Sequence, residues 1–229
     1  MGDLPRHQRP LDHFPRFGAY YPARAEVEAA APVLRVSGAV KRPLEMPVTR
    51  LESLERRDQV ADFHCVAGWT RQEIRWSGVG FRVFHDSVIK PEAEPDPEVT
   101  HVVFEGADGY RAVCLIEDAM EDDVLLADRL EGAPLTYDHG APLRLLSPRQ
   151  YAYKSAKHVV AIELHRGEPP DWHPRAFRRL LLAILKPHPR ARVSHEERHR
   201  YLPAWAVRWF YRRLFRPFIW LGRRGLQAK

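Results

Sequence analysis

The sequence predicts one α+β domain of mixed sheets and short helices, followed by a basic, aromatic-rich tail. Short alternating or apolar runs separated by turn residues recur along residues 33–164, with only brief helical stretches between them. Hydrophobic residues make up 45% and charged residues 29% of the 229, which suits a soluble protein with one sizeable core. Residues 173–229 carry 15 Lys and Arg against 2 Asp and Glu, whereas residues 1–172 carry 21 against 28. An acidic body with a basic tail indicates two functional regions.

The first predicted elements lead toward a cysteine. Residues 33–38 alternate apolar and polar side chains, as a half-buried strand does, and residues 46–48 form a second short strand after a turn. Thr49 is expected to cap a brief helix that runs through Arg56, with Glu52 at the capping-box position. This segment predicts a strand–turn–strand–helix lead-in.

Residues 61–80 are the stretch around which the domain is organised. An apolar run predicts a short buried strand that ends at Cys65 and enters a turn at Gly68. A second turn is expected at Gly78 and Gly80. A strand end that feeds a loop is a place where a rigid scaffold can present a reactive side chain.

The rest of the domain continues in short elements. The predicted strands are residues 101–104, 111–116, 143–146 and 159–164, with a candidate helix at 117–123 and an apolar stretch at 124–130. Residues 101–104 and 111–116 are separated by a Gly-containing turn and are expected to pair as a hairpin. Gly and Pro residues near 165–171 mark a boundary, so we predict a domain over residues 1–171 and an extension over residues 172–229.

The extension contains two apolar runs at helical spacing, residues 177–186 and residues 203–222, the second of which interleaves aromatic side chains with arginines. Neither run reaches the ~20 uncharged residues of a membrane-spanning helix. Two interpretations stay open. The extension could be a basic amphipathic helix that lies on a membrane or a partner, or a helical hairpin that packs on the domain or on a second copy.

The two cysteines cannot form a disulfide framework, and no C-x-x-C pair is present for a zinc site. Cys114 lies in an apolar run and is expected to be a buried thiol of a reducing compartment. The N-terminal residues show no apolar signal segment and no twin arginine, so we expect a cytoplasmic protein, with peripheral membrane attachment as a further option.

Two motifs resemble a known family. The first is Phe63-His64-Cys65-Val66-x-x-Trp69-Thr70, followed by Trp76-x-Gly78-Val79. The second is His139-Gly140-Ala141-Pro142-Leu143-Arg144, followed by Pro148 and by Tyr151-Ala152-Tyr153-Lys154-Ser155-Ala156-Lys157-His158. Their order and separation resemble the molybdopterin-dependent oxidoreductases of the sulfite oxidase fold, cytoplasmic type. This resemblance covers about residues 33–164 and implies that fold for the domain.

The resemblance also implies roles for individual residues. Cys65 would be the single protein ligand of molybdenum and the catalytic residue, because a thiolate is a soft donor that metal binding keeps deprotonated. The pterin and its phosphate would be bound by Asp108, His139, Arg144, Ser155, Ala156 and Lys157, since a buried phosphate requires fixed cations and donors. Asp108 could equally be a turn aspartate bonded to its own backbone. His64 is expected on the opposite face of the strand from Cys65.

The implied activity is a two-electron oxygen-atom transfer on a small anionic or sulfoxide-type substrate, in which Arg71 and Arg75 are candidate substrate contacts. The cofactors are molybdenum and molybdopterin. No haem-attachment motif is present, so a separate electron-transfer protein is expected, with a membrane haem protein as one candidate. Nucleic acid is not an expected partner. The alternative is a membrane- or partner-binding module that acts through the extension, with the fold retained but not catalytic.

Overall fold

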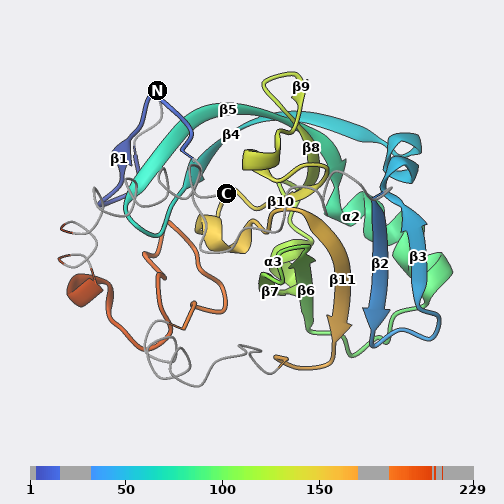
Figure 1. Ribbon diagram of the computed structural model, residues 1–229. Coiled ribbons are helices and arrows are strands. Elements are labelled where there is room, and N and C mark those ends of the chain that lie inside the picture. Colours follow the sequence, from blue (N-terminus) through green and yellow to red (C-terminus); the bar gives the residue numbers. More distant parts are fainter. Residues whose placement is uncertain (1–3, 16–31, 170–185, 208, 210–212, 214–229) are drawn as a thin grey trace.

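The chain folds into two β-sheets joined by short helices (Figure 1). The computed structural model describes residues 4–15, 32–169, 186–207, 209 and 213. All but the last residue of the predicted apolar run at 177–186 therefore lies outside the described residues. The mixed, β-rich domain with few short helices confirms the predicted character of the body.

Within the described residues, the first sheet has six strands and carries the cysteine. These strands are β1 (Arg9–Pro10), β4 (Arg56–His64), β5 (Trp69–Gly80), β8 (Leu125–Leu130), β9 (Ala133–Pro134) and β10 (Arg144–Leu146). The long curved pair β4 and β5 is antiparallel, and β5 pairs in turn with β8, which pairs with β10. The sheet thereby connects the strand before Cys65 to the strand that begins at Arg144 (Figure 1).

The second sheet, counted over the same residues, has five strands in the order β3-β2-β11-β6-β7. Its strands are β2 (Val33–Gly38), β3 (Leu44–Pro47), β6 (His101–Gly106), β7 (Arg111–Leu115) and β11 (Val159–His165). Strands β6 and β7 form the predicted hairpin, and β11 runs parallel to β2. Cys114 is buried in this sheet, at 1% exposure, as expected.

Short helices connect the strands. They are η1 (Val48–Ser53), α2 (Phe81–Phe84), η2 (His85–Ala93), α3 (Ile116–Ala119), η3 (Tyr137–His139) and η4 (Ala152–Lys154). The buried apolar residues form two clusters. The larger joins the second sheet to α2 and η2, and the smaller, on the first sheet, contains Phe63, Cys65, Trp69 and Trp76. Cys65 therefore belongs to an aromatic core rather than to an exposed loop.

The predicted turn at Gly78 and Gly80 is wrong, because β5 runs through both residues and ends at Gly80, where α2 follows. Gly78 is required for another reason. A Cβ atom at this position would lie 2.2 Å from the carbonyl oxygen of Leu126 on β8. The glycine thus permits the close approach of β5 and β8 at a register shift. In the sequence alone, a glycine with this role resembles a turn residue.

The capping-box helix expected between Thr49 and Arg56 is also wrong in its bounds. The observed element is a 3-10 helix, η1, that starts after Pro47, has no side-chain cap and ends at Ser53. Arg56 already begins β4. Strand pairing of β4 with the twelve-residue β5 prevails over the local capping signal, because it satisfies many more backbone groups.

The described part of the extension lies against the body and is irregular over residues 186–203, between the two predicted helices, with turns and isolated bridges. Helical residues begin at Ala204. The backbone of this segment is bonded to the body, because the N–H of Tyr151 donates to the carbonyl of Ala191 at 2.9 Å. The division at residue 171 stays a prediction. Among the described helices, none combines the length and hydropathy that crossing a membrane requires.

Candidate active site

Cys65 sits in a tight turn between β4 and β5. Its N–H donates to the carbonyl of Trp69 at 2.8 Å, and its own carbonyl accepts from Gly68 N–H at 3.0 Å and from Gln8 Nε2 at 3.2 Å. The residue is 2% exposed. Both backbone groups of Cys65 are fixed by hydrogen bonds, so the direction of its side chain is set by the fold.

The environment of Cys65 favours the neutral thiol. Burial raises the pKa of this thiol to about 12, although the Ala67 N–H, which donates to Sγ at 3.5 Å, and the positive charge of Arg198 act in the opposite direction. A thiol with this pKa is unreactive at neutral pH. It becomes a thiolate when a metal binds it, because coordination displaces the proton.

The two faces of β4 differ as strand alternation requires. Phe63 belongs to the same aromatic core as Cys65, whereas His64 bonds Thr70 Oγ1 through Nδ1 at 2.8 Å and lines a cavity of about 960 Å³. Burial lowers the pKa of His64, which favours the neutral imidazole. This cavity does not include Cys65, so its size does not identify the active site.

Aromatic rings join Cys65 to a buried arginine. Phe14 packs edge-on against Phe63 and Trp76, at ring-centre distances of 4.8 and 5.9 Å. The Arg144 guanidinium lies over the rings of Phe63 and Trp76, at 5.0 and 5.1 Å. The cysteine motif and the arginine motif, far apart in the sequence, therefore meet around one aromatic cluster.

Arg144 is a fully buried cation without a counter-ion. Its Nη1 donates to the carbonyl of His139 at 2.8 Å, and its Nη2 lies 3.4 Å from the carbonyl of Ser155. Among the described residues no carboxylate pairs with it, and its Nε has no hydrogen-bond partner. Burial lowers the pKa of Arg144 to about 9. An isolated buried charge is costly, so this arrangement indicates a place for an anion.

A neutral imidazole and a lysine lie near Arg144. Burial, followed by the charges of Arg144 and Lys157, lowers the pKa of His139 to about 4. Lys157 Nζ donates to the carbonyl of Asp138 at 2.6 Å. Gly140 has a φ of 103°, and a Cβ there would lie 3.0 Å from Lys157 Cβ, so glycine allows the two loops to meet.

The other predicted pterin contacts lie in adjoining loops. Asp108 Oδ1 accepts from Tyr110 N–H at 3.0 Å, as a turn aspartate does, and burial raises the pKa of its carboxyl group. Ser155 Oγ accepts from Ser147 N–H at 3.1 Å. Ala156 is buried beside them, where its carbonyl accepts from Leu145 N–H at 2.8 Å. These residues border the cluster around Arg144, and their cofactor roles remain predictions.

The structure places the two candidate substrate arginines on β5. Arg75 has 65% of its side chain exposed and its Nε lies 3.9 Å from Glu131. Arg71 donates from Nη1 to the carbonyl of Gln72 at 3.0 Å. Arg198, which sequence reasoning did not single out, lies close to Cys65 instead. Its position in the extension, far from either motif, left no local signal.

Comparison with known proteins identifies the domain. The family model described as "Oxidoreductase molybdopterin binding domain" matches residues 21–173. This chain belongs to that family. The match spans both motifs, and it establishes a molybdopterin-binding oxidoreductase domain of the sulfite oxidase type.

Several relatives are similar over this region. The chain is 30% identical over 142 residues to the uncharacterized oxidoreductase YuiH of Bacillus subtilis, an alignment that covers 62% of this chain and 69% of YuiH. It is 29% identical to the catalytic subunit MsrP of a protein-methionine-sulfoxide reductase from Gluconobacter oxydans, covering 60% of this chain and 48% of MsrP. The chain thus spans about half the length of that relative.

A solved structure has the same fold. The sulfane dehydrogenase SoxCD from Paracoccus pantotrophus superimposes with a TM-score of 0.52 at 26% identity, covering 60% of this chain and 39% of the SoxCD chain. The arrangement of two sheets with short helices is therefore shared with a solved structure, which confirms the predicted fold of the body.

The residues present fit the cofactor that the family name specifies. Cys65 supplies a soft, buried donor, which molybdenum binding requires. Arg144 supplies a buried cation with an unsatisfied Nε, and Trp76 Nε1 is a second buried donor with no hydrogen-bond partner among the described residues. Unsatisfied buried donors of this kind are uncommon in folded proteins, and an anionic group bound beside them would accept their hydrogen bonds.

Proposed function

We propose that this protein is a molybdenum–molybdopterin oxidoreductase in which the Cys65 thiolate binds molybdenum. The observation that carries the proposal is the meeting of a buried lone thiol and a buried, unpaired Arg144 around one aromatic cluster. A buried thiol alone would be an ordinary core residue. A buried, unpaired arginine alone would only destabilise the fold. Together they provide a soft ligand for a metal and a cation for a phosphate.

The cofactor would be held by Cys65, Asp108, His139, Arg144, Ser155, Ala156 and Lys157. Arg144 offers a planar fork suited to phosphate oxygens, and Lys157 adds a point charge. His139 stacks on Phe14 with ring centres 4.6 Å apart, which fixes the imidazole plane. Burial lowers the pKa of His139 most, and the charges of Arg144 and Lys157 lower it further; binding of a phosphate dianion would offset the effect of these two charges.

When bound, the molybdenum centre would supply two-electron oxygen-atom transfer chemistry on a small substrate. The residues of the chain have the tasks of positioning and exclusion. Cys65 is fixed by its backbone hydrogen bonds, and the aromatic residues Phe14, Phe63 and Trp76 keep water from the space between Cys65 and Arg144.

We propose a sulfoxide-type substrate ahead of an anion such as sulfite. Two relatives carry names that refer to protein-methionine-sulfoxide reductase, MsrP of Gluconobacter oxydans and YedZ1 of Azospira oryzae. Comparing turnover of methionine sulfoxide and sulfite by the purified protein distinguishes the two.

A separate electron-transfer protein would exchange electrons with the centre, and a membrane haem protein is our proposed partner. The name of the Azospira relative describes a subunit, which is consistent with a divided system. We also propose a cytoplasmic location. Copurification with a haem protein from membranes of the native host tests the first proposal, and fractionation of the native cells tests the second.

Elemental analysis tests the central proposal. The wild-type protein, made in a host that synthesises molybdopterin, should contain close to stoichiometric molybdenum. Cys65→Ser should lose activity and change the coordination of the metal, as measured by X-ray absorption. Cys114→Ser is the matched control, because Cys114 is equally buried but lies in the other core cluster. Absence of molybdenum from the wild type would overturn the proposal.

A second candidate function is attachment through the extension. Tyr201, Trp205 and Trp209 are spaced four residues apart and are 64%, 73% and 64% exposed, and Arg213 lies 5.0 Å over the Trp209 ring. Exposed tryptophans beside arginines suit the interface of an anionic membrane. Replacing Trp205 and Trp209 by Ser should reduce sedimentation with phosphatidylserine vesicles while molybdenum content stays constant. Unchanged sedimentation would eliminate this candidate.

A further inference from the structure

Residues 186–200 lie beyond the region that the family model matches, yet they bond directly to the loop that follows β10. Tyr151 N–H donates to the carbonyl of Ala191 at 2.9 Å, and Val193 N–H donates to the carbonyl of Arg149 at 3.0 Å. Gln150 Nε2 donates to the carbonyl of Arg190 at 2.5 Å. This segment, which we name the C-terminal strap, is thus held by backbone groups of the catalytic domain.

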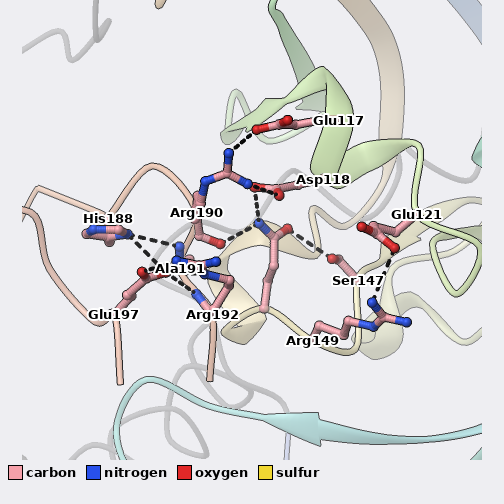
Figure 2. Close-up of polar contacts among 11 residues, drawn as sticks. Glu117, Asp118, Glu121, Ser147, Arg149, His188, Arg190, Ala191, Arg192 and Glu197 are labelled. Atoms are coloured by element: carbon pink, nitrogen blue, oxygen red, sulfur yellow. Dashed lines mark hydrogen bonds and ion pairs between the residues drawn. The ribbon is translucent and has the colours of Figure 1, made fainter. Parts of the chain in front are cut away.

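Ion pairs fix the strap to the body, the first of them at Arg190 (Figure 2). Arg190 lies between Glu117 and Asp118, with Nη1 2.8 Å from Asp118 Oδ1. Farther along, Arg200 lies 2.7 Å from Glu168. These arginines face carboxylates and remain partly exposed, so they serve attachment.

Arg198 differs from them in every respect. It is 2% exposed, its Nε has no hydrogen-bond partner, and no carboxylate among the described residues pairs with it. Its Nη1 donates to the carbonyl of Val66, the residue after Cys65. Its guanidinium lies 4.9 Å over the ring of Tyr151, while its own carbonyl accepts from Tyr153 Oη at 3.0 Å. The side chain is therefore held at the cysteine turn from both ends.

We propose that Arg198 is a positioning residue of the metal site, supplied by the C-terminal strap to the turn that carries Cys65. Its bond to the carbonyl of Val66 fixes this turn and holds a permanent charge at the residue next to Cys65. The inference rests on the proposed function, because the thiolate of a metal-bound Cys65 would be the anion that balances Arg198. The strap then completes a site that the family domain leaves unfinished.

The role predicts an electrostatic signature. A fixed positive charge near a metal favours its reduced form, which carries the more negative charge. Removing the charge should lower the reduction potential of the bound molybdenum and slow turnover, with little change in molybdenum content. A residue that only fastened the strap would change stability and leave the potential unaltered.

Three variants of the full-length, molybdenum-loaded protein test this. Arg198→Gln keeps a donor for Val66 but removes the charge, and Arg198→Lys keeps the charge. Arg200→Gln is the control, since it removes a strap anchor away from Cys65. The potential is measured by redox titration of the Mo(V) electron paramagnetic resonance signal, together with kcat and KM. We expect a lower potential and at least tenfold lower kcat in Arg198→Gln, a near wild-type potential in Arg198→Lys, and an unchanged signal in Arg200→Gln.

The outcomes separate the two proposals. Wild-type protein without molybdenum would overturn the proposed function and this inference with it. Wild-type protein with molybdenum, but with the same signal and potential in Arg198→Gln, would overturn this inference alone. Equal shifts in Arg198→Gln and Arg200→Gln would also overturn it, because the effect would then come from loosening the strap. Should Arg198→Gln not fold, Arg198→Met, an unbranched side chain without charge, replaces it in the same redox titration with the same expected results.

Discussion

Five of the described arginines, near the strap and near Cys65, form two groups with opposite environments. Where the strap meets the body, Arg149, Arg190 and Arg200 each face carboxylates and remain partly exposed. Around Cys65, Arg144 and Arg198 are buried and face backbone carbonyls and aromatic rings. The arginines of the first group form ion pairs that hold neighbouring segments together. Those of the second group have no carboxylate partner among the described residues and could bind an anion.

The two groups of arginines differ more in the free-energy cost of placing their charge than in their position. A surface ion pair contributes about 0–1 kcal/mol and is easily lost or gained. A buried charge without a partner costs several kcal/mol and persists only where function requires it. The pairing state of a buried arginine is therefore better evidence for a binding site than the size of a cavity, since the cavity of about 960 Å³ lies on the His64 side of β4.

The largest expected effect follows from removing the unpaired charge of Arg144. Arg144→Met should lower the molybdopterin content of the purified protein at least tenfold, because one charge-assisted hydrogen bond contributes about 1.5–3 kcal/mol. The same change should leave the cofactor-free protein as stable as the wild type or more stable by about 1–2 kcal/mol. Cofactor extraction and urea unfolding measure the two effects.

Opposite signs are the decisive feature of this prediction. A structural arginine would lose stability on replacement, and its loss of cofactor would follow from unfolding. Arg149→Met, in the neighbouring loop, is the matched control and should retain cofactor. Arg144→Met with full cofactor content would contradict the assignment of the phosphate site.

Sequence alone predicted what is encoded locally. Alternating runs located β2, β6 and β11 to within two residues at either end, and the two motifs contained Cys65 and Arg144. What failed had non-local causes. Gly78 is a glycine because β8 approaches it, and the expected helix after Thr49 is shortened by the pairing of β4 with β5.

The contribution of the strap could not be predicted for the same reason. Arg198 is one of 15 basic residues after residue 172, and nothing in its sequence neighbourhood distinguishes it. Its role depends on tertiary contacts with Val66 and Tyr151, more than 40 residues away in the chain. Charge composition predicted a basic tail, whereas burial and pairing show which of its arginines has a separate role.

The strap anchor should show a moderate effect on stability. Asp118→Asn removes the charge that faces Arg190 Nη1 at 2.8 Å, from a side chain that is 14% exposed. We expect a loss of no more than about 1 kcal/mol in the free energy of unfolding, because a charged hydrogen-bond partner is lost but burial, which raises the pKa of Asp118, already disfavours its charge. Chemical denaturation measures it. A change below about 0.3 kcal/mol would show that this pair does not fasten the strap.

Acid should weaken the cofactor-free protein through His139. The folded-state pKa of about 4 lies below the ordinary value of 6.5, so the unfolded chain binds the proton first as the pH falls. Stability is therefore lost between about pH 6.5 and pH 4, by about 1 kcal/mol once solvent screening of this half-buried ring is considered. His139→Gln should reduce that loss. Burial also lowers the pKa of His158, but this residue is present in the wild type and in His139→Gln. The difference between the unfolding curves of the two proteins at each pH therefore isolates His139.

The smallest effect is expected where an exposed arginine is already paired. Arg149 lies 2.9 Å from Asp123 and 3.2 Å from Glu121, but 65% of its side chain is exposed. Arg149→Met should change the free energy of unfolding by no more than about 0.5 kcal/mol, and the difference should disappear in 1 M salt, where the Debye length is about 3 Å. Urea titrations at low and high salt measure this. A larger, salt-independent loss would place Arg149 with Arg144 and Arg198, and pairing with carboxylates would then no longer distinguish attachment from function.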